Sequence, residues 1–261
     1  MKPKLWEWGK EMRGILFGMA FATLGLSATP AWADVAGRYE TIDENSFFKM
    51  EMTVEADSAG NVRVQMARQA SCYLLLDGEL YVIGRDTSGI IVTRLEDAVA
   101  AVTEAAQQMG FDDSFLQDEP EPSVPTFVAM GEETVGDRKG TAYGMAGADG
   151  SEPLRADFVI SNDPRLAPLG KALADLQKSM KPSTSAFGRV SIALGRMTDE
   201  MVAVLEQGAP IKMTQLELTD FSLDAIDPER FRLPAEPLTL EQLRAQQEPF
   251  PPPPTLPIKE E

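Results

Sequence analysis

A run of short strand patterns between residues 47 and 93 limits this chain to few folds. Apolar and polar residues alternate over residues 47–56 and 62–66, and apolar runs follow over residues 72–76, 80–84 and 90–93. The turn sequences Ser58-Ala59-Gly60-Asn61 and Asp77-Gly78 separate these segments, and Asp-Gly between apolar runs is a strong hairpin signal. Parallel strands need a crossover of about a dozen residues, which these connections cannot hold. The pattern therefore predicts a meander of five antiparallel strands.

Helical spacing begins where these strands end. Apolar residues recur every three or four positions at Leu95, Val99, Val102, Ala106 and Met109. This spacing predicts a helix over residues 95–109 that covers one face of the sheet.

The second half of the chain mixes strand and helix patterns. Strands are predicted over residues 126–130, 141–145, 156–160 and 211–221. Helices are predicted over residues 166–180, from a cap at Thr198 to Gly208, and from the capping pair Thr239 and Gln242 to residue 247. We assign Gly144, Gly147 and Gly150 to a hairpin turn, because their spacing does not fit a nucleotide-binding loop. Together these elements indicate the α+β class.

The first 33 residues are typical of a secretory signal peptide. The basic residues Lys2, Lys4, Lys10 and Arg13 precede an apolar run over residues 14–26, and Ala31-Trp32-Ala33 is a small-x-small cleavage site. We expect cleavage after Ala33, export to the periplasm, and one domain over residues 34–247. A bilayer span needs about 20 apolar residues, so a permanent membrane anchor is the less favoured alternative.

The composition opposes several kinds of chemistry. The chain has no histidine, and its three tryptophans all precede residue 34. Catalytic triads that use histidine and ordinary zinc sites are therefore excluded. The formal charge of −17 becomes −19 once four basic and two acidic residues leave with the signal peptide, and it opposes binding to nucleic acid and to anionic lipid headgroups. We expect no cofactor, no metal site and no enzymatic activity, with a histidine-independent hydrolase as a minor alternative.

Cys72 is the only cysteine of the chain. It lies in the apolar run over residues 71–76, where a free thiol is typical of a small buried hydrophobic side chain. A reactive thiol or an intermolecular disulfide is the alternative.

Two segments outside the predicted elements are rich in acidic residues or proline. Residues 111–125 are acidic but lack EF-hand spacing, which favours a solvated loop over a calcium site. Residues 248–261 contain Pro249 and a run of four prolines, which predicts an extended, disordered tail. Capture of a protein partner by this tail is the alternative.

Two parts of the chain resemble a known family. The strands from Asn61-Val62-Arg63-Val64 through residues 76–83 to Ile90-Ile91-Val92 resemble the meander of the LolA-type periplasmic lipoprotein carriers and related exported domains. The segment Asp227-Pro228-Glu229-Arg230-Phe231-Arg232-Leu233-Pro234 is similar to the D-P-x-x-F-x-x-P sequence that closes many such domains. The resemblance implies an open half-barrel, in which a curved antiparallel sheet wraps around a few α-helices and leaves a concavity for acyl chains. It transfers no binding residue to this chain.

The candidate binding site is a methionine-rich face of the first strands. Met50, Met52 and Val54 share one face with Val64 and Met66 of the return strand, and flexible thioethers suit a cavity that accepts varied apolar ligands. We expect these five residues to line a cavity that binds a lipid, an acyl chain or a lipoprotein. In one alternative the methionines fill an irregular core. In another, the protein is an envelope scaffold that captures a partner through its acidic surface or its tail.

Overall fold

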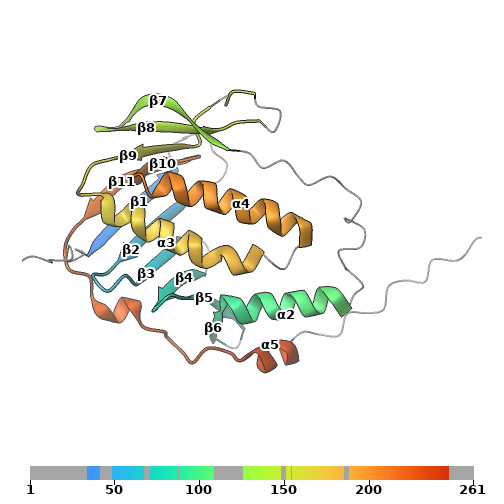
Figure 1. Cartoon of the computed structure of the whole chain (residues 1–261). Helices are drawn as coiled ribbons and strands as arrows, with labels where there is room; N and C mark the ends of the chain where they lie inside the picture. The colour runs from blue at the N-terminus through green and yellow to red at the C-terminus, as the bar shows by residue number, and fades with distance from the viewer. Residues whose placement is uncertain are drawn as a thin grey trace, which may run out of the picture. The chain divides into compact units, whose positions relative to one another are not determined.

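Eleven antiparallel strands from both halves of the chain form one sheet (Figure 1). The computed structural model describes residues 34–41, 49–67, 71–87, 89–108, 126–147, 151–153, 155–184 and 188–246. The predictions for the signal peptide, for the acidic segment 111–125 and for the tail 248–261 lie outside these residues.

Each half of the chain contributes one meander. The first consists of β1 (Val35–Thr41), β2 (Glu51–Ala56), β3 (Val62–Met66), β4 (Cys72–Leu76), β5 (Glu79–Asp86) and β6 (Gly89–Arg94). The second consists of β7 (Phe127–Val135), β8 (Arg138–Met145), β9 (Phe158–Ser161), β10 (Ala209–Met213) and β11 (Leu216–Ser222). Pairing of β1 with β11 joins the two meanders, while the edge strands β6 and β7 do not pair with each other. The sheet is therefore open.

The predicted meander of five strands is confirmed as β2 to β6. Between β4 and β5, Asp77 and Gly78 both have positive φ, 50° and 83°, as a two-residue turn of the hairpin type requires. The strand β1 was not predicted. It pairs with β2 on one side and with β11 on the other, so the strand that was not predicted is the central strand of the sheet.

Three helices lie on one face of the sheet (Figure 1): α2 (Leu95–Gln108), α3 (Ala167–Thr184) and α4 (Gly188–Leu205). Helix α3 contacts β1, β2, β3, β5 and β10, and α4 packs beside it. Helix α2 contacts β5 and β6, as predicted, but Val102 of its predicted apolar stripe is 57% exposed and Ala101 is buried instead. The short α5 (Leu240–Gln246) packs on α2, where Arg244 donates to the Glu104 carboxylate at 2.6 Å. No helix in the described ranges is long and apolar enough to cross a bilayer.

The main core lies between this helical layer and the sheet. Alternate residues of the strands point into it, and several are fully buried, including Val35, Tyr39, Val54 and Ile211. Leu166, which directly precedes α3, and Leu169, in its first turn, are also fully buried. Gly37 of β1 leaves room for this packing, because a Cβ atom there would lie 2.7 Å from Cδ2 of Leu169.

Three local predictions are wrong. Thr198 does not cap a helix but lies inside α4, where its hydroxyl donates to the Leu194 carbonyl at 2.9 Å. Residues 211–221 form two strands instead of one, because Thr214 adopts a left-handed conformation with φ of 51° and turns the chain back. Of the three glycines assigned to a hairpin turn, Gly144 lies instead within β8, where a side chain would overlap Pro153, whereas Gly147 follows that strand and Gly150 lies outside the described residues.

The capping prediction at Thr239 and Gln242 is confirmed. The Thr239 hydroxyl accepts from the Gln242 amide at 3.2 Å, and the Gln242 side chain accepts from the Thr239 amide at 2.8 Å. This reciprocal pair is a capping box at the start of α5.

The face of the sheet opposite the helices carries a second, smaller core. The 3-10 helix η3 (Pro228–Phe231) lies on this face and buries Phe231 against Leu74, Tyr81 and Val92. Asp227 caps η3 by accepting from the Glu229 amide at 3.0 Å. The segment with the D-P-x-x-F-x-x-P sequence therefore attaches the C-terminal part of the chain to the outside of the sheet.

Candidate functional site

A pocket of about 460 Å³ lies between helix α3 and one end of the sheet. It is bordered by β2, β3, β4, α3 and the turn between β10 and β11. Ligand pockets commonly have volumes of roughly 300–1,000 Å³, so this one has the size of a small-molecule site. Its lining consists of Met50, Met52, Val64, Met66, Tyr73, Leu173, Leu176, Gln177, Met180, Met213, Thr214, Gln215 and Leu216. We call it the methionine pocket.

The five methionines of the lining come from four separate segments. Met50, Met52 and Met66 come from the first meander, Met180 from α3 and Met213 from the end of β10. Unbranched, polarizable thioethers adapt their shape to different apolar partners, which is why methionine is frequent at promiscuous binding surfaces. Met50 is 38% exposed, so part of this lining is reached from solvent.

Strand register brings the predicted residues together. Met52 pairs with Met66 and Val54 with Val64 across β2 and β3, and residues two apart on a strand share a face. Four of the five predicted residues, Met50, Met52, Val64 and Met66, line the pocket. Val54 does not line it, because it is fully buried in the main core. Ligand binding by these residues stays a prediction.

The helix supplies the opposite wall. Leu173, Leu176, Gln177 and Met180 are spaced three, four and seven positions apart and therefore lie on one face of α3. This spacing was visible in the sequence within the predicted helix 166–180, but the sequence did not show which of the predicted strands this face of the helix would meet. Tyr73 and Met213 were missed as lining residues, and only the pairing of their strands places them here.

The lining of the methionine pocket offers little chemistry beyond apolar contact. It holds no Asp, Glu, Lys, Arg or Cys, and its polar groups are those of Tyr73, Gln177, Thr214 and Gln215. Apolar surface leaving water contributes about 25 cal/mol per Å². The arrangement can therefore bind an apolar ligand and orient a polar end of it through amide and hydroxyl groups.

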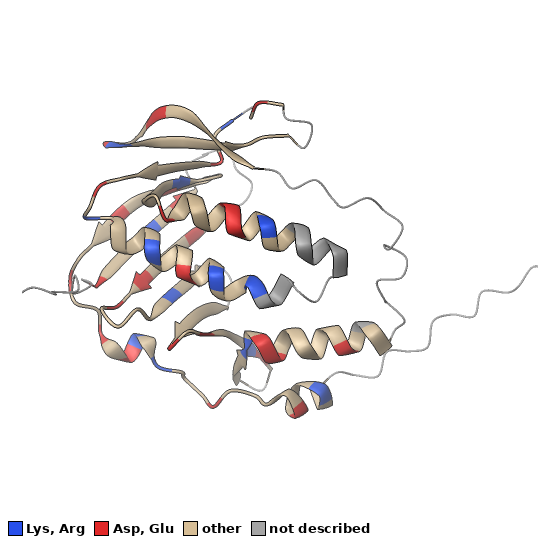
Figure 2. Cartoon of the chain, viewed as in Figure 1, with Lys and Arg blue, Asp and Glu red and all other residues tan. Residues whose placement is uncertain are grey.

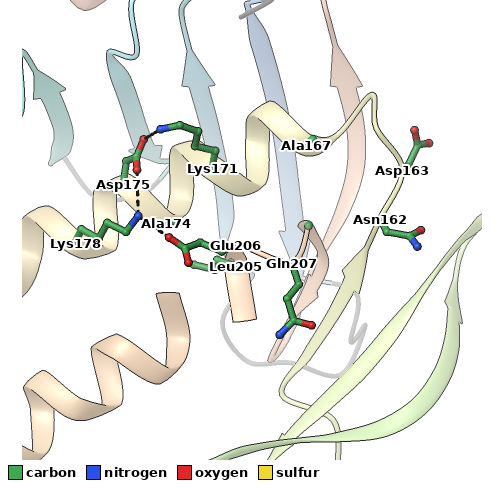
Figure 3. Close-up of a pocket in the computed structure, with 11 residues that line it drawn as sticks. Asn162, Asp163, Ala167, Lys171, Ala174, Asp175, Lys178, Leu205, Glu206 and Gln207 are labelled. Atoms are coloured by element: carbon green, nitrogen blue, oxygen red, sulfur yellow. Dashed lines mark hydrogen bonds and ion pairs between the residues drawn. The ribbon is translucent and has the colours of Figure 1, made fainter. Parts of the chain in front are cut away.

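A second, polar pocket of about 270 Å³ lies beside α3, where β10 begins. Helix α3 carries basic residues with one acidic residue among them (Figure 2), and Figure 3 shows charged side chains that pair within this pocket. Lys178 lies 2.7 Å from Glu206 and 3.7 Å from Asp175, and Asp175 also pairs with Lys171. The hydrogen bond to Glu206 raises the pKa of Lys178. Since these charges neutralise one another, the pocket is a weak candidate for a charged ligand.

Cys72 is a free, buried cysteine, as its apolar surroundings predicted. Burial raises the pKa of its thiol, although the neighbouring Arg63 guanidinium acts in the opposite direction. The thiol is therefore kept in its protonated, weakly nucleophilic form. The described residues contain no group of three or more His, Cys, Asp or Glu side chains placed to hold a metal ion.

The methionine pocket is thus the place where four of the five residues predicted from the sequence meet in the fold. Its lining is built from segments as far apart in the chain as Met50 and Leu216. Comparisons of this chain with family models, with curated proteins and with solved structures found no match.

Proposed function

We propose that this protein is an exported, non-enzymatic binder of acyl chains, and that the ligand occupies the methionine pocket. The observation that carries the proposal is the convergence of five methionines on one apolar pocket of about 460 Å³. Each methylene buried from water contributes about 0.8 kcal/mol, so a chain of several methylenes gains useful affinity without a charged partner. A lipid, a free acyl chain or the acyl chains of a lipoprotein all fit this chemistry.

The open sheet supports the half-barrel that the family resemblance implies. Helix α3 contacts β10 of the second meander and β1, β2, β3 and β5 of the first, which supports a sheet that bends around this helix. Because β6 and β7 are unpaired edges, such a sheet leaves room beside its helices instead of closing over them.

Export to the periplasm is the second part of the proposal. Asp34, the residue expected to begin the exported form, accepts from the amide of Ser58 at 2.9 Å and from that of Ile226 at 2.7 Å. These bonds tie the proposed N-terminus to the turn between β2 and β3 and to the segment between β11 and η3. Intact-mass measurement of protein from the periplasm is expected to give a chain that begins at Asp34, and retention of residues 1–33 would contradict export with cleavage.

Ligand binding is tested with a matched pair of methionine substitutions. Met66→Trp replaces a thioether chain in the methionine pocket with a bulky indole ring. Met130→Trp places the same ring on β7, at a position that is 44% exposed and lies outside the methionine pocket. Overpacking costs about 1–3 kcal/mol, so Met66→Trp is expected to weaken binding of a fluorescent fatty acid by about tenfold. Met130→Trp is expected to bind like the unmodified chain.

A second measurement locates the ligand directly. The exported form contains no tryptophan, so Met180→Trp introduces a single emitter at the wall of the methionine pocket. A brominated fatty acid is expected to quench this emission and to leave that of Met130→Trp unchanged. If no fatty-acyl probe binds, and native mass spectrometry of gently purified protein shows no lipid, the carrier proposal is wrong and a scaffold role is favoured.

A further inference from the structure

On the face of the sheet opposite α3, the segment that contains η3 borders another pocket, of about 510 Å³. Val64 and Met66 of β3 face the helices, so the alternate residues Arg63 and Gln65 of the same strand face the other side, where η3 lies. Gln65 pairs with Cys72 of β4, and Cys72 pairs with Ile83 of β5, so these residues extend the same face of the sheet. The sheet thus supplies a floor that is partly apolar, and the η3 segment supplies a wall.

Four arginines line this pocket, which we call the arginine groove. Arg63 and Arg85 come from the sheet, and Arg230 and Arg232 come from the η3 segment. Two of them are held in place by Glu55, whose side chain is 9% exposed. Its Oε2 lies 3.1 Å from Nη1 of Arg63, and its Oε1 lies 2.7 Å from Nη2 of Arg230.

Further contacts orient the first guanidinium. Nη2 of Arg63 donates to the side-chain oxygen of Gln65 at 2.7 Å. A guanidinium has five N–H donors in a fixed fork. One carboxylate shared by two arginines cannot accept from all of their donors, so each guanidinium keeps unused N–H groups. Arg63 and Arg230 are therefore positioned cations with donors available for another acceptor.

The balance of charge in the arginine groove is opposite to that of the whole chain. Its four arginines face Glu55 and Glu229, which leaves an excess of positive charge in a chain with a formal charge of −17. Arg232 is paired with Glu229 at 2.6 Å, but Arg85 is exposed and forms no ion pair with any other described residue. Among the four arginines, Arg85 is thus the one whose charge no carboxylate of the described residues already pairs.

The acidic surroundings restrict the size of that anion. Salt screens the interaction between exposed charges beyond about 8–10 Å at moderate ionic strength. A small anion inside the groove is therefore attracted by the nearby arginines more than it is repelled by distant acidic residues. A polyanion extends beyond this range and meets the acidic remainder of the chain.

We infer that the arginine groove binds a single phosphate group, carried by a small molecule or by the head of a phospholipid. Arginine forks match the oxygens of phosphate with two parallel hydrogen bonds, which a compact ammonium group cannot provide. The apolar floor formed by Ile83 and Ile90 accommodates the organic part of such a ligand. This site is separate from the methionine pocket and does not depend on the proposed acyl binding.

The test titrates the chain with inorganic phosphate and, separately, with a soluble short-chain phosphatidylglycerol. Binding is followed through the NMR signals of the arginine side-chain N–H groups. Arg85→Gln removes the hydrogen bonds of a charged donor, so it is expected to raise the Kd by about tenfold or more. Arg38→Gln is the matched control, because Arg38 lies on β1 outside the groove and pairs with Glu40 and Glu51.

The two ligands distinguish the sources of the phosphate. Tighter binding of the phospholipid identifies a lipid head, and equal or tighter binding of inorganic phosphate identifies a small phosphorylated compound. If neither ligand shifts the arginine signals, or if Arg85→Gln and Arg38→Gln bind alike, the inference is wrong. Fatty-acid binding in the methionine pocket is expected to be unchanged in Arg85→Gln, so the two proposals succeed or fail separately.

Discussion

The phenolic hydroxyl of Tyr39 donates to the backbone carbonyl of Pro210 at 2.9 Å, across 171 positions of the chain. Tyr39 lies on β1 and Pro210 on β10, so this bond reaches past β11 and ties the two meanders together. Tyr39 is fully buried, and this burial raises its pKa far above the ordinary range of tyrosine. The hydroxyl therefore stays protonated and available as a donor.

Removing this hydroxyl is expected to weaken the connection between the meanders. Tyr39→Phe keeps the ring but leaves the Pro210 carbonyl without this donor, at an expected cost of about 1–3 kcal/mol in the free energy of unfolding. Tyr73→Phe is the control, because the Tyr73 hydroxyl makes no hydrogen bond within the described ranges, and its cost is expected to stay within about 0.5 kcal/mol. Urea unfolding curves measure both, and equal costs would contradict the structural role of Tyr39.

Two helical glycines are expected to respond to alanine in opposite directions. A Cβ atom on Gly170 of α3 would overlap the backbone carbonyl of Gly208, whereas one on Gly195 of α4 would meet nothing within 4 Å. Gly170→Ala is expected to destabilise the fold by about 1–3 kcal/mol through overpacking. Gly195→Ala is expected to stabilise it by about 0.4–1 kcal/mol, since alanine restricts the unfolded chain. Thermal unfolding distinguishes the two, and stabilisation by both substitutions would refute the close approach at Gly170.

Phe231 is expected to anchor the η3 segment. Phe231→Ala empties the small core formed with Leu74, Tyr81 and Val92, at an expected cost of about 3–5 kcal/mol. Phe231→Leu keeps most of the apolar volume and is expected to cost less. Limited proteolysis followed by mass spectrometry should show faster cleavage over residues 223–239 in the alanine variant. Equal cleavage in both variants would mean that other contacts hold the segment.

The thiol of Cys72 is expected to link stability to pH. Because burial raises its pKa in the folded chain, the unfolded chain loses the proton first as the pH rises. The contribution of Cys72 to stability is therefore complete below the ordinary thiol pKa and is lost as the pH climbs above it. Between about pH 8 and about pH 10, the unmodified chain should lose more stability than Cys72→Ala does.

Iodoacetamide should alkylate the native thiol more slowly than the thiol in urea, and equal rates would show that Cys72 is accessible.

Much of the local structure followed from the sequence. The Asp77-Gly78 turn, the alternation in β2 and β3, and the apolar spacing of α2 depend on neighbours close in the chain. The capping box of Thr239 and Gln242 is equally local. Such features are predictable because turn chemistry and side-chain periodicity act over a few residues.

The pairing at the centre of the sheet did not follow from the sequence. Ala36 of β1 pairs with Ser222 of β11, and no local pattern indicates which distant strand will lie next to another. The turn at Thr214 was missed for a different reason. Threonine rarely adopts positive φ, and here the pairing of Met213 with Leu216 fixes the turn.

The candidate sites divide in the same way. Alternation in the sequence placed Met52, Val64 and Met66 on one face of the sheet, but it could not separate them from Val54, which is packed in the core. A pocket is the space that packing leaves unfilled, so its walls are decided by tertiary contacts such as those of α3 with β2. The meeting of Arg63 with Arg230 at Glu55 likewise exists only because Phe231 fastens the η3 segment to the outside of the sheet.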